Sequence, residues 1–134
     1  MALSGYSGTP LPQKLGLKPD AAARVIGWDG DYAQLLGAVP AGVSFGDTSD
    51  LDFVHVFVTR RNELEVQLTR LRGEIKPNGM IWVSWPKKSS KMETDITEDT
   101  IREVALPLGL VDTKVAAVTE IWSGLRLVIR KENR

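Results

Sequence analysis

Residues 51–58 carry the strongest strand pattern in the chain, with the sequence LDFVHVFV. The segment is rich in β-branched and aromatic side chains and nearly continuous in apolar character, which is typical of a central strand in a parallel sheet covered on both faces. Residues 80–85, MIWVSW, form a second buried strand pattern that ends before Pro86. Parallel strands are usually connected through helices, so these two runs indicate an α/β fold.

Two segments with an apolar period of 3.6 supply the expected helices. Their apolar positions are Leu64, Leu68 and Leu71 in the first segment and Ile101, Val104, Ala105 and Leu108 in the second. Asn62 with Glu65, and Asp95 with Glu98, have the spacing of a capping box. Each pair is therefore expected to start one of the two helices.

The remaining segments complete a single domain over residues 14–134, preceded by an irregular arm at residues 1–13. The other expected elements are a strand at 24–28, a short helix at 31–36, a brief strand at 43–45, a turn at 76–79 and two final strands at 110–118 and 125–130. The final pair is expected to form an antiparallel hairpin linked through residues 122–124. This order predicts a three-layer, Rossmann-like α/β domain with a mostly parallel sheet of about five or six strands.

The composition excludes several kinds of site. The chain has no cysteine, which rules out disulfides, thiolate metal sites and cysteine nucleophiles, and its one histidine, His55, cannot build a zinc site alone. Its 17 basic and 17 acidic residues cancel, so the net charge does not indicate nucleic acid as a partner. No apolar run approaches the ~20 residues that span a bilayer, and no secretion signal is recognisable. We expect a cytoplasmic protein without a membrane partner.

Several motifs resemble class I S-adenosylmethionine-dependent methyltransferases, over roughly residues 15–130. Residues 15–19 with 24–27 are similar to the run-in and first strand of that family, and residues 75–83 to its fifth strand with the preceding turn. The closing hairpin is similar to its last two strands. The segments GYSGTPL, WPKK, TDITED and WSGL together resemble, more specifically, a family of small bacterial proteins of unknown function. The resemblance implies a methyltransferase-like fold with the two buried strands side by side.

The cofactor-binding positions of the methyltransferases are changed in this chain. Their glycine-rich turn corresponds to residues 27–32, GWDGDY, in which Trp28 stands between two glycines. The candidates for the acidic residue that holds the ribose hydroxyls are Asp47 and Asp50, and the segment before the central strand is too short for the usual two strands and two helices. Residues 59–61, TRR, replace the Asn-Pro-Pro-Tyr motif. We therefore expect a missing strand-helix unit, and S-adenosylmethionine to bind weakly or not at all.

Ligand-binding side chains are expected at the carboxyl ends of the parallel strands, where open α/β sheets bind ligands. Four loops meet at that edge and supply the candidates Trp28, Asp29, Gly30, Thr59, Arg60, Arg61, Trp85, Lys87, Lys88, Trp122 and Ser123. The basic pairs at residues 60–61 and 87–88 would together form an anion site. Trp28 or Trp85 would stack on a base. The same features also fit a solvated basic loop and tryptophans that plug a vestigial pocket.

The residues specify no reaction, and no catalytic or metal-binding residue is assigned. The changed cofactor loop and the lack of a nucleophile-base pair favour a non-catalytic binding or interaction module on a degenerate methyltransferase-like fold. Two alternatives stay open: an S-adenosylmethionine-dependent methyltransferase with an atypical cofactor loop, and a protein that binds an anionic small molecule or nucleotide at the basic edge. His55 is expected to be a hydrogen-bonded structural residue of the central strand.

Overall fold

A six-stranded sheet forms the centre of the structure, a computed structural model that describes residues 8–134. The strands are β1 (Ala22–Ile26), β2 (Ser44–Phe45), β3 (Leu51–Phe57), β4 (Ile75–Pro86), β5 (Leu110–Ala117) and β6 (Trp122–Ile129), in the order β2-β1-β3-β4-β6-β5. Strands β2, β1, β3 and β4 run parallel, and β6 lies antiparallel between β4 and β5. The predicted mostly parallel sheet with an antiparallel C-terminal hairpin is confirmed.

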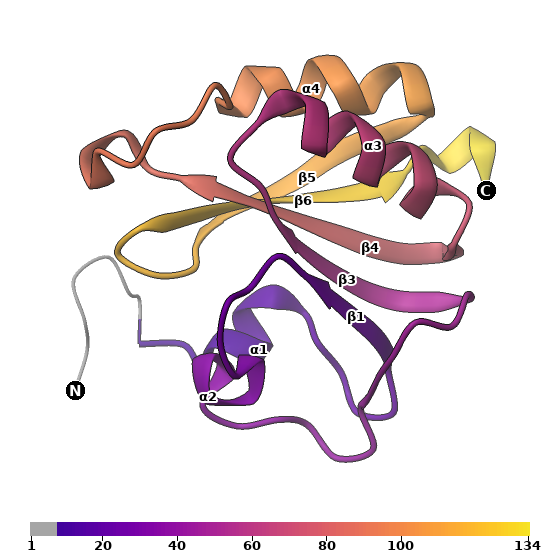
Figure 1. Cartoon of the computed structure of the whole chain (residues 1–134). Helices are drawn as coiled ribbons and strands as arrows, with labels where there is room; N and C mark the ends of the chain where they lie inside the picture. Colours follow the sequence, from indigo (N-terminus) through magenta and orange to yellow (C-terminus); the bar gives the residue numbers. More distant parts are fainter. Residues whose placement is uncertain (1–7) are drawn as a thin grey trace.

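Helices lie on both faces of this sheet (Figure 1). They are α1 (Leu11–Leu15), α2 (Tyr32–Leu36), α3 (Arg61–Arg72) and α4 (Glu98–Ala105), with the short 3-10 helices η1 (Lys88–Ser90), η2 (Leu106–Leu108) and η3 (Lys131–Asn133). Helices α3 and α4 cover one face, whereas α1 and α2 lie against the other. The predicted three-layer arrangement is confirmed. Within residues 8–134, no helix is long and apolar enough to cross a membrane.

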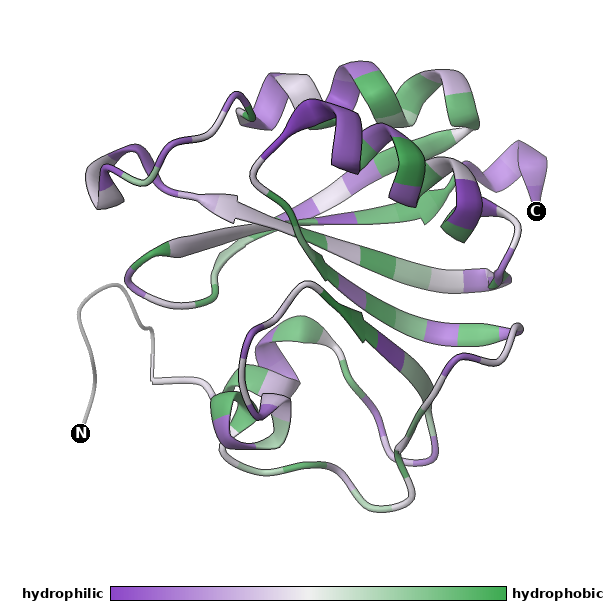
Figure 2. Ribbon diagram, viewed as in Figure 1, coloured by the Kyte–Doolittle hydropathy of each residue, from purple (hydrophilic) through white to green (hydrophobic). Residues whose placement is uncertain are grey.

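The larger core layer lies between the sheet and helices α3 and α4. Side chains alternate between the two faces of a strand, so Val54 and Val56 of β3 point toward this layer. They share one buried cluster with the helix positions Leu64, Leu68, Leu71, Ile101, Val104 and Ala105. Each fully buried leucine contributes about 1.5–3 kcal/mol to folding. Figure 2 shows hydrophobic segments, in green, along the strands and along the helices above them.

The smaller core layer lies between the sheet and helices α1 and α2. Phe53 and Trp82 are buried in this layer, and the Trp82 Nε1 donates a hydrogen bond to the Leu15 carbonyl oxygen at 2.7 Å. This bond ties α1 to the sheet. Helix α1 begins at Leu11, so the end of the segment predicted as an irregular arm is helical, and residues 1–7 of that arm lie outside the described residues.

The start of α3 differs from the predicted capping box. The helix begins at Arg61, before Asn62, and Glu63 Oε1 accepts a hydrogen bond from the backbone N–H of Arg60 at 3.2 Å. Asp95 Oδ1 accepts a second bond, from the Arg61 N–H at 2.7 Å. Asp95 therefore stabilises the start of α3, although its spacing predicted a role in α4.

The start of α4 is stabilised by threonines. Thr97 is the N-cap residue, and its Oγ1 accepts a hydrogen bond from the Thr100 N–H at 3.2 Å. The Thr97 N–H in turn donates to Thr100 Oγ1 at 3.1 Å. The predicted pair of Asp95 and Glu98 was wrong, because local spacing cannot show that the loop before α4 folds back onto α3.

Two segments that were predicted as connections belong to strands. Residues 76–79 lie within β4 as an irregularity in its pairing with β3. Glycine suits this bend, because a Cβ on Gly79 would lie 2.7 Å from the Leu51 carbonyl oxygen. Residues 122–124 begin β6 and pair with β4, so the hairpin link is shorter than predicted.

The connection from β2 to β3 is short and is held by a buried arginine. Residues 46–50 alone separate these strands, which leaves no space for a further strand and helix. Arg24 of β1 is buried, forms an ion pair with Glu74 and donates from Nη2 to the Thr48 carbonyl oxygen at 2.9 Å. The arginine therefore fixes the shortened edge of the sheet to the end of α3.

The core layer under α3 gives a direct test of the fold. Leu68→Ala should lower the free energy of unfolding by about 2–5 kcal/mol, because it leaves a cavity at a fully buried position. Val66→Ala on the same helix is the matched control, and it should change stability by less than about 0.5 kcal/mol because Val66 is 67% exposed. Urea unfolding followed by circular dichroism measures both. Equal effects of the two substitutions would contradict the assigned inner face of α3.

Candidate functional site

The predicted site edge contains an aromatic cluster centred on Phe57. The ring centroid of Trp28, from the loop after β1, lies 4.9 Å from that of Phe57, and the Trp122 ring meets the other side in an edge-to-face contact at 5.3 Å. Two of the predicted tryptophans are therefore brought together at the carboxyl edge. Phe57 was not among the predicted site residues. The alternation along β3 could have identified it, since it places Phe57 on the same face as Phe53.

Gly27 brings the loop after β1 against strand β3. Its φ is 83°, and a Cβ at this position would lie only 2.3 Å from the Phe57 carbonyl oxygen. Strand β1 consequently ends at Ile26, earlier than the sequence indicated. The glycine permits close approach to protein backbone, whereas the resemblance to methyltransferases associates this turn with close approach to a ligand.

Trp28 fills the space next to this turn. The residue is half-buried, and its Nε1 is buried without a hydrogen-bond partner among the described residues. The same nitrogen lies 3.3 Å from the position that a Cβ on Gly30 would take. Asp29 and Gly30 are exposed at the rim. The turn is therefore packed against its own tryptophan.

The predicted basic residues do not share one electrostatic environment. Arg60 forms an ion pair with Glu93 at 3.4 Å. Arg61 pairs with Glu103 at 2.7 Å and with Glu65 at 3.4 Å, and these hydrogen bonds raise the pKa of Arg61. Both arginines are thus compensated by carboxylates of the chain itself, which weakens the case for their binding an external anion.

The two predicted lysines differ from the arginines. Neither Lys87 nor Lys88 takes part in an ion pair within residues 8–134. Lys87 is half-buried and its N–H donates to the Ile121 carbonyl oxygen at 2.7 Å, whereas Lys88 is exposed at the start of η1. The four predicted cations therefore divide into a compensated pair and an uncompensated pair.

The other predicted site residues have structural contacts. Trp85 is buried in the core layer beneath α3 and α4, on the opposite face of the sheet from Trp28 and Trp122. Ser123 is half-buried in β6 and pairs with Trp85 in the sheet. The Thr59 carbonyl oxygen accepts a hydrogen bond from the Thr94 hydroxyl at 2.7 Å. Trp85 is therefore not placed to stack on a ligand beside Trp28.

A buried polar chain crosses the smaller core layer. His55 Nδ1 lies 2.6 Å from the Tyr32 hydroxyl, and its Nε2 lies 2.7 Å from the Ser84 hydroxyl. Neutral imidazole has one donor and one acceptor, and each hydroxyl can fill either role, so both ring nitrogens are satisfied. Burial lowers the pKa of His55 to about 3 and raises that of Tyr32. The predicted hydrogen-bonded structural histidine is confirmed.

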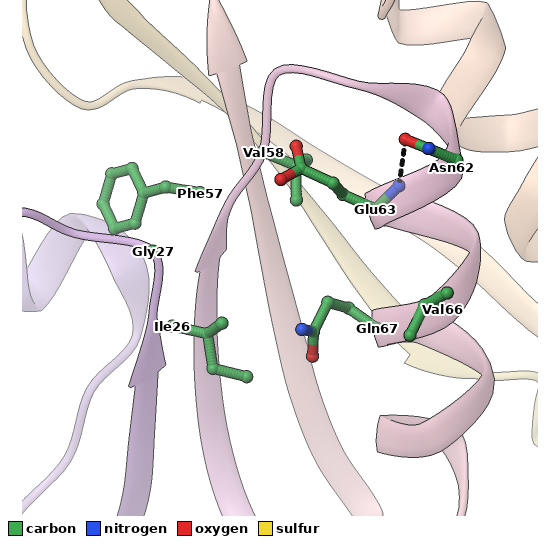
Figure 3. A pocket seen from close by; sticks show the side chains of 8 residues that line it. All are labelled: Ile26, Gly27, Phe57, Val58, Asn62, Glu63, Val66 and Gln67. Carbon is green, nitrogen blue, oxygen red and sulfur yellow. Dashed lines mark hydrogen bonds between the residues drawn. The ribbon is translucent and has the colours of Figure 1, made fainter.

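A cavity of about 350 Å³ opens between the carboxyl ends of β1 and β3 and helix α3 (Figure 3). It is lined by Ile26, Gly27, Phe57, Val58, Asn62, Glu63, Val66 and Gln67. The Glu63 carboxylate is already engaged by the backbone at the start of α3, so it is a poor general base. Within residues 8–134, no group of three or more His, Cys, Asp or Glu side chains is arranged to hold a metal ion.

Solved structures with the same fold are methyltransferases and related proteins. The fibrillarin pre-rRNA processing protein of Methanococcus jannaschii has a TM-score of 0.63 and 11% identity, over 91% of this chain and 69% of that one. The precorrin-6y C5,15-methyltransferase of Geobacter metallireducens has a TM-score of 0.60 and 14% identity, over 96% and 92%. A SAM-dependent methyltransferase of Aquifex aeolicus has a TM-score of 0.56 and 15% identity, over 87% of each chain.

These similarities show a shortened methyltransferase-like fold. At the level of sequence, residues 12–131 match the family described as "Protein of unknown function (DUF3052)". None of the curated proteins matches the chain.

The buried histidine predicts a loss of stability in acid. The folded-state pKa of His55 is about 3, below the ordinary value of 6.5, so below pH 6.5 the unfolded chain binds a proton that the folded chain does not. The contribution of neutral His55 to the free energy of unfolding should therefore be fully present above pH 6.5 and fall toward pH 3. At pH 4.5 the loss from this group should be roughly 2–3 kcal/mol. His55→Gln, which does not titrate, should lack that part of the slope. Urea unfolding at several pH values measures it, and identical slopes in both proteins would contradict a buried neutral His55.

Proposed function

The chain belongs to the DUF3052 family, and we propose that it is a non-catalytic binding module on a shortened methyltransferase-like fold. The contact between Gly27 and the Phe57 carbonyl oxygen carries this proposal. In a cofactor-binding turn, glycine leaves room for the ligand to approach the backbone. In this chain Gly27 approaches the backbone of strand β3 and the Trp28 ring contacts Phe57, which supports a turn packed against the protein itself.

The surroundings of the polar side chains support the same proposal. The histidine and serine that are hydrogen-bonded to each other, His55 and Ser84, are both fully buried within the sheet. A general base must reach the proton that it removes, directly or through one water, and neither residue reaches solvent. Carboxylates near the edge, such as Glu63 and Asp95, are used to stabilise the start of α3. These groups fit a structural role better than acid-base catalysis.

The alternative is that the chain is itself an S-adenosylmethionine-dependent methyltransferase, because the solved structures with this fold include SAM-dependent methyltransferases. Such an enzyme would have to bind its cofactor through an atypical loop at Trp28. A similar fold at this level of sequence identity does not establish that two proteins share an activity. We also propose the reducing cytoplasm of a bacterium as the location, which suits a chain without cysteine.

A measurement of S-adenosylmethionine binding distinguishes the non-catalytic binding module from the methyltransferase. A ligand at a hundred times its dissociation constant adds about 2.7 kcal/mol to stability, which raises the melting temperature of a domain of this size by several degrees. We expect no such rise with millimolar S-adenosylmethionine or S-adenosylhomocysteine, as measured by thermal shift and checked by calorimetric titration. A reproducible rise with matching heat would establish cofactor binding and refute the proposal.

Two variants test the part played by Trp28. Trp28→Gly removes the ring beside Gly27 and should open space at the turn, whereas Trp28→Phe, the matched control, keeps that space filled. Cofactor binding that is gained by Trp28→Gly and absent in Trp28→Phe would support a pocket closed by its own tryptophan. Binding in the parent protein that both variants retain would show that Trp28 does not close it.

A further inference from the structure

The crossover from β2 to β3 leaves part of one sheet face without a helix. These parallel strands flank β1, so the chain must cross β1 between them, and it does so through residues 46–50 alone. Parallel strands are usually joined by a helix that covers the sheet. The loop is held at Arg24, whose Nε and Nη2 donate to the Gly46 and Thr48 carbonyl oxygens at 3.3 and 2.9 Å. The carboxyl end of β1 therefore has no crossover helix above it.

Ile26 lies at this end of β1. It is two residues after Arg24 on the strand, so both side chains share the face that carries α3. Ile26 packs at the border of the larger core layer and is only half-buried. Val66 of α3 is 67% exposed, and both residues line the cavity of about 350 Å³ shown in Figure 3. The cavity therefore lies where a crossover helix is lacking.

The cavity is also at the point where the strand order reverses. From β1 the chain continues to β2 on one side, and from β3 it continues to β4 on the other. Open α/β sheets bind ligands in the crevice at the carboxyl ends of the strands at such a point. A volume of about 350 Å³ is large enough for a small molecule. Trp28 packs in the core layer of α1 and α2, on the opposite face of the sheet, so the cavity is not the space beside its ring.

The Gln67 carboxamide supplies the cavity with a directed hydrogen-bond donor. Its Oε1 accepts a hydrogen bond from Arg70 Nη2 at 2.8 Å, which identifies the other terminal atom as the amide nitrogen. Within residues 8–134, this Nε2 atom has no hydrogen-bond partner. Figure 3 shows it pointing into the cavity, toward β1. A donor held in this way matches a ligand that carries a carbonyl oxygen.

The charges around the cavity disfavour an anion. Its lining contains no lysine, arginine or histidine, and it includes the Glu63 carboxylate. Two backbone donors at the start of α3 are already occupied, because the Arg61 N–H donates to Asp95 at 2.7 Å and the Glu63 N–H to Asn62 Oδ1 at 2.8 Å. An anionic ligand would meet the charge of Glu63 without a compensating cation. A neutral ligand is therefore favoured.

We propose that this cavity binds a neutral, largely apolar small molecule that carries a carbonyl oxygen. We refer to the space lined by Ile26, Val58, Val66 and Gln67 as the switch-point cavity. Its apolar walls contact the body of the ligand, and Gln67 Nε2 donates to the carbonyl, which keeps a hydrogen bond as it leaves water. The inference rests on the proposed binding function and gives that function a ligand class.

Titration of the whole chain with Prodan, a neutral naphthalene dye that carries a ketone, tests the site. The emission of the dye moves to shorter wavelength in apolar surroundings, so saturable binding is followed by fluorescence. Gln67→Glu keeps the shape of the side chain but replaces the donor by an acceptor, so the affinity should fall about ten-fold. Gln34→Glu, at an exposed glutamine of α2, is the matched control and should bind like the parent. No saturable binding by the parent, or equal affinity in all three proteins, would overturn the proposal.

A carbonyl-free analogue of the dye distinguishes recognition of the carbonyl from general apolar binding. In this analogue a methylene group replaces the ketone of Prodan, and its affinity is measured by displacement of the dye. The preference for Prodan over the analogue should be about ten-fold greater in the parent than in Gln67→Glu, because only the parent can donate to the carbonyl. An equal preference in the two proteins would mean that Gln67 does not recognise the carbonyl, and the proposal would be wrong.

Amide NMR spectra of the whole chain locate the bound dye. Prodan should shift the signals of Gly27, Val58 and Gln67, which line the switch-point cavity. Shifts confined to the separate cavity beside Leu17 and Val39 would place the dye elsewhere and overturn the proposal. Dye binding that is lost as the protein concentration rises would identify a second copy of the chain as the occupant, and it would also overturn the proposal.

Failure of this inference is distinct from failure of the proposed function. The proposed function fails if S-adenosylmethionine binds to the chain. The inference fails if a neutral dye with a carbonyl does not bind through Gln67. The two results come from different ligands, so each can be obtained without the other.

Discussion

The burial of strand β3 on both faces is the constraint on which the rest of the structure depends. Phe53 faces one core layer and Val54 the other, and each is at most 1% exposed. A strand that exposes neither face needs a packed layer on each side, so α3 and α4 are required above it and α1 and α2 below it. Its edges are paired with β1 and β4. The polar side chain within it, His55, must find its partners inside the protein, and it does so in Tyr32 and Ser84.

The same strand shapes the candidate site at its carboxyl end. Phe57 presents its carbonyl oxygen to Gly27 and its ring to Trp28 and Trp122. The loop after β1 is thereby packed against the backbone of β3 and against the ring of Phe57. Proteins that share this architecture can differ at this edge, so the fold alone does not define the activity.

The neutral sequence conceals a separation of charge in the folded chain. Arginines and carboxylates of α3, α4 and their loops neutralise one another, as Arg102 does with Glu98 and Asp112. On the side of α1, by contrast, partial burial and the positive charges of Lys87 and Lys114 lower the pKa of Lys14. Net charge is a sum over the chain, whereas binding depends on the charges that the fold brings together.

The sequence by itself determined the strands, the main helices and the closing hairpin, because apolar period is a local property of the chain. It also contained a signal that Trp82 and Trp85 face opposite sides, since they are three residues apart on one strand. Only the tertiary structure decided that Asp95 caps α3 and that Lys114 donates a hydrogen bond to the Lys14 carbonyl oxygen. These contacts join residues from separate elements, and their geometry depends on how the layers pack, which no local pattern encodes.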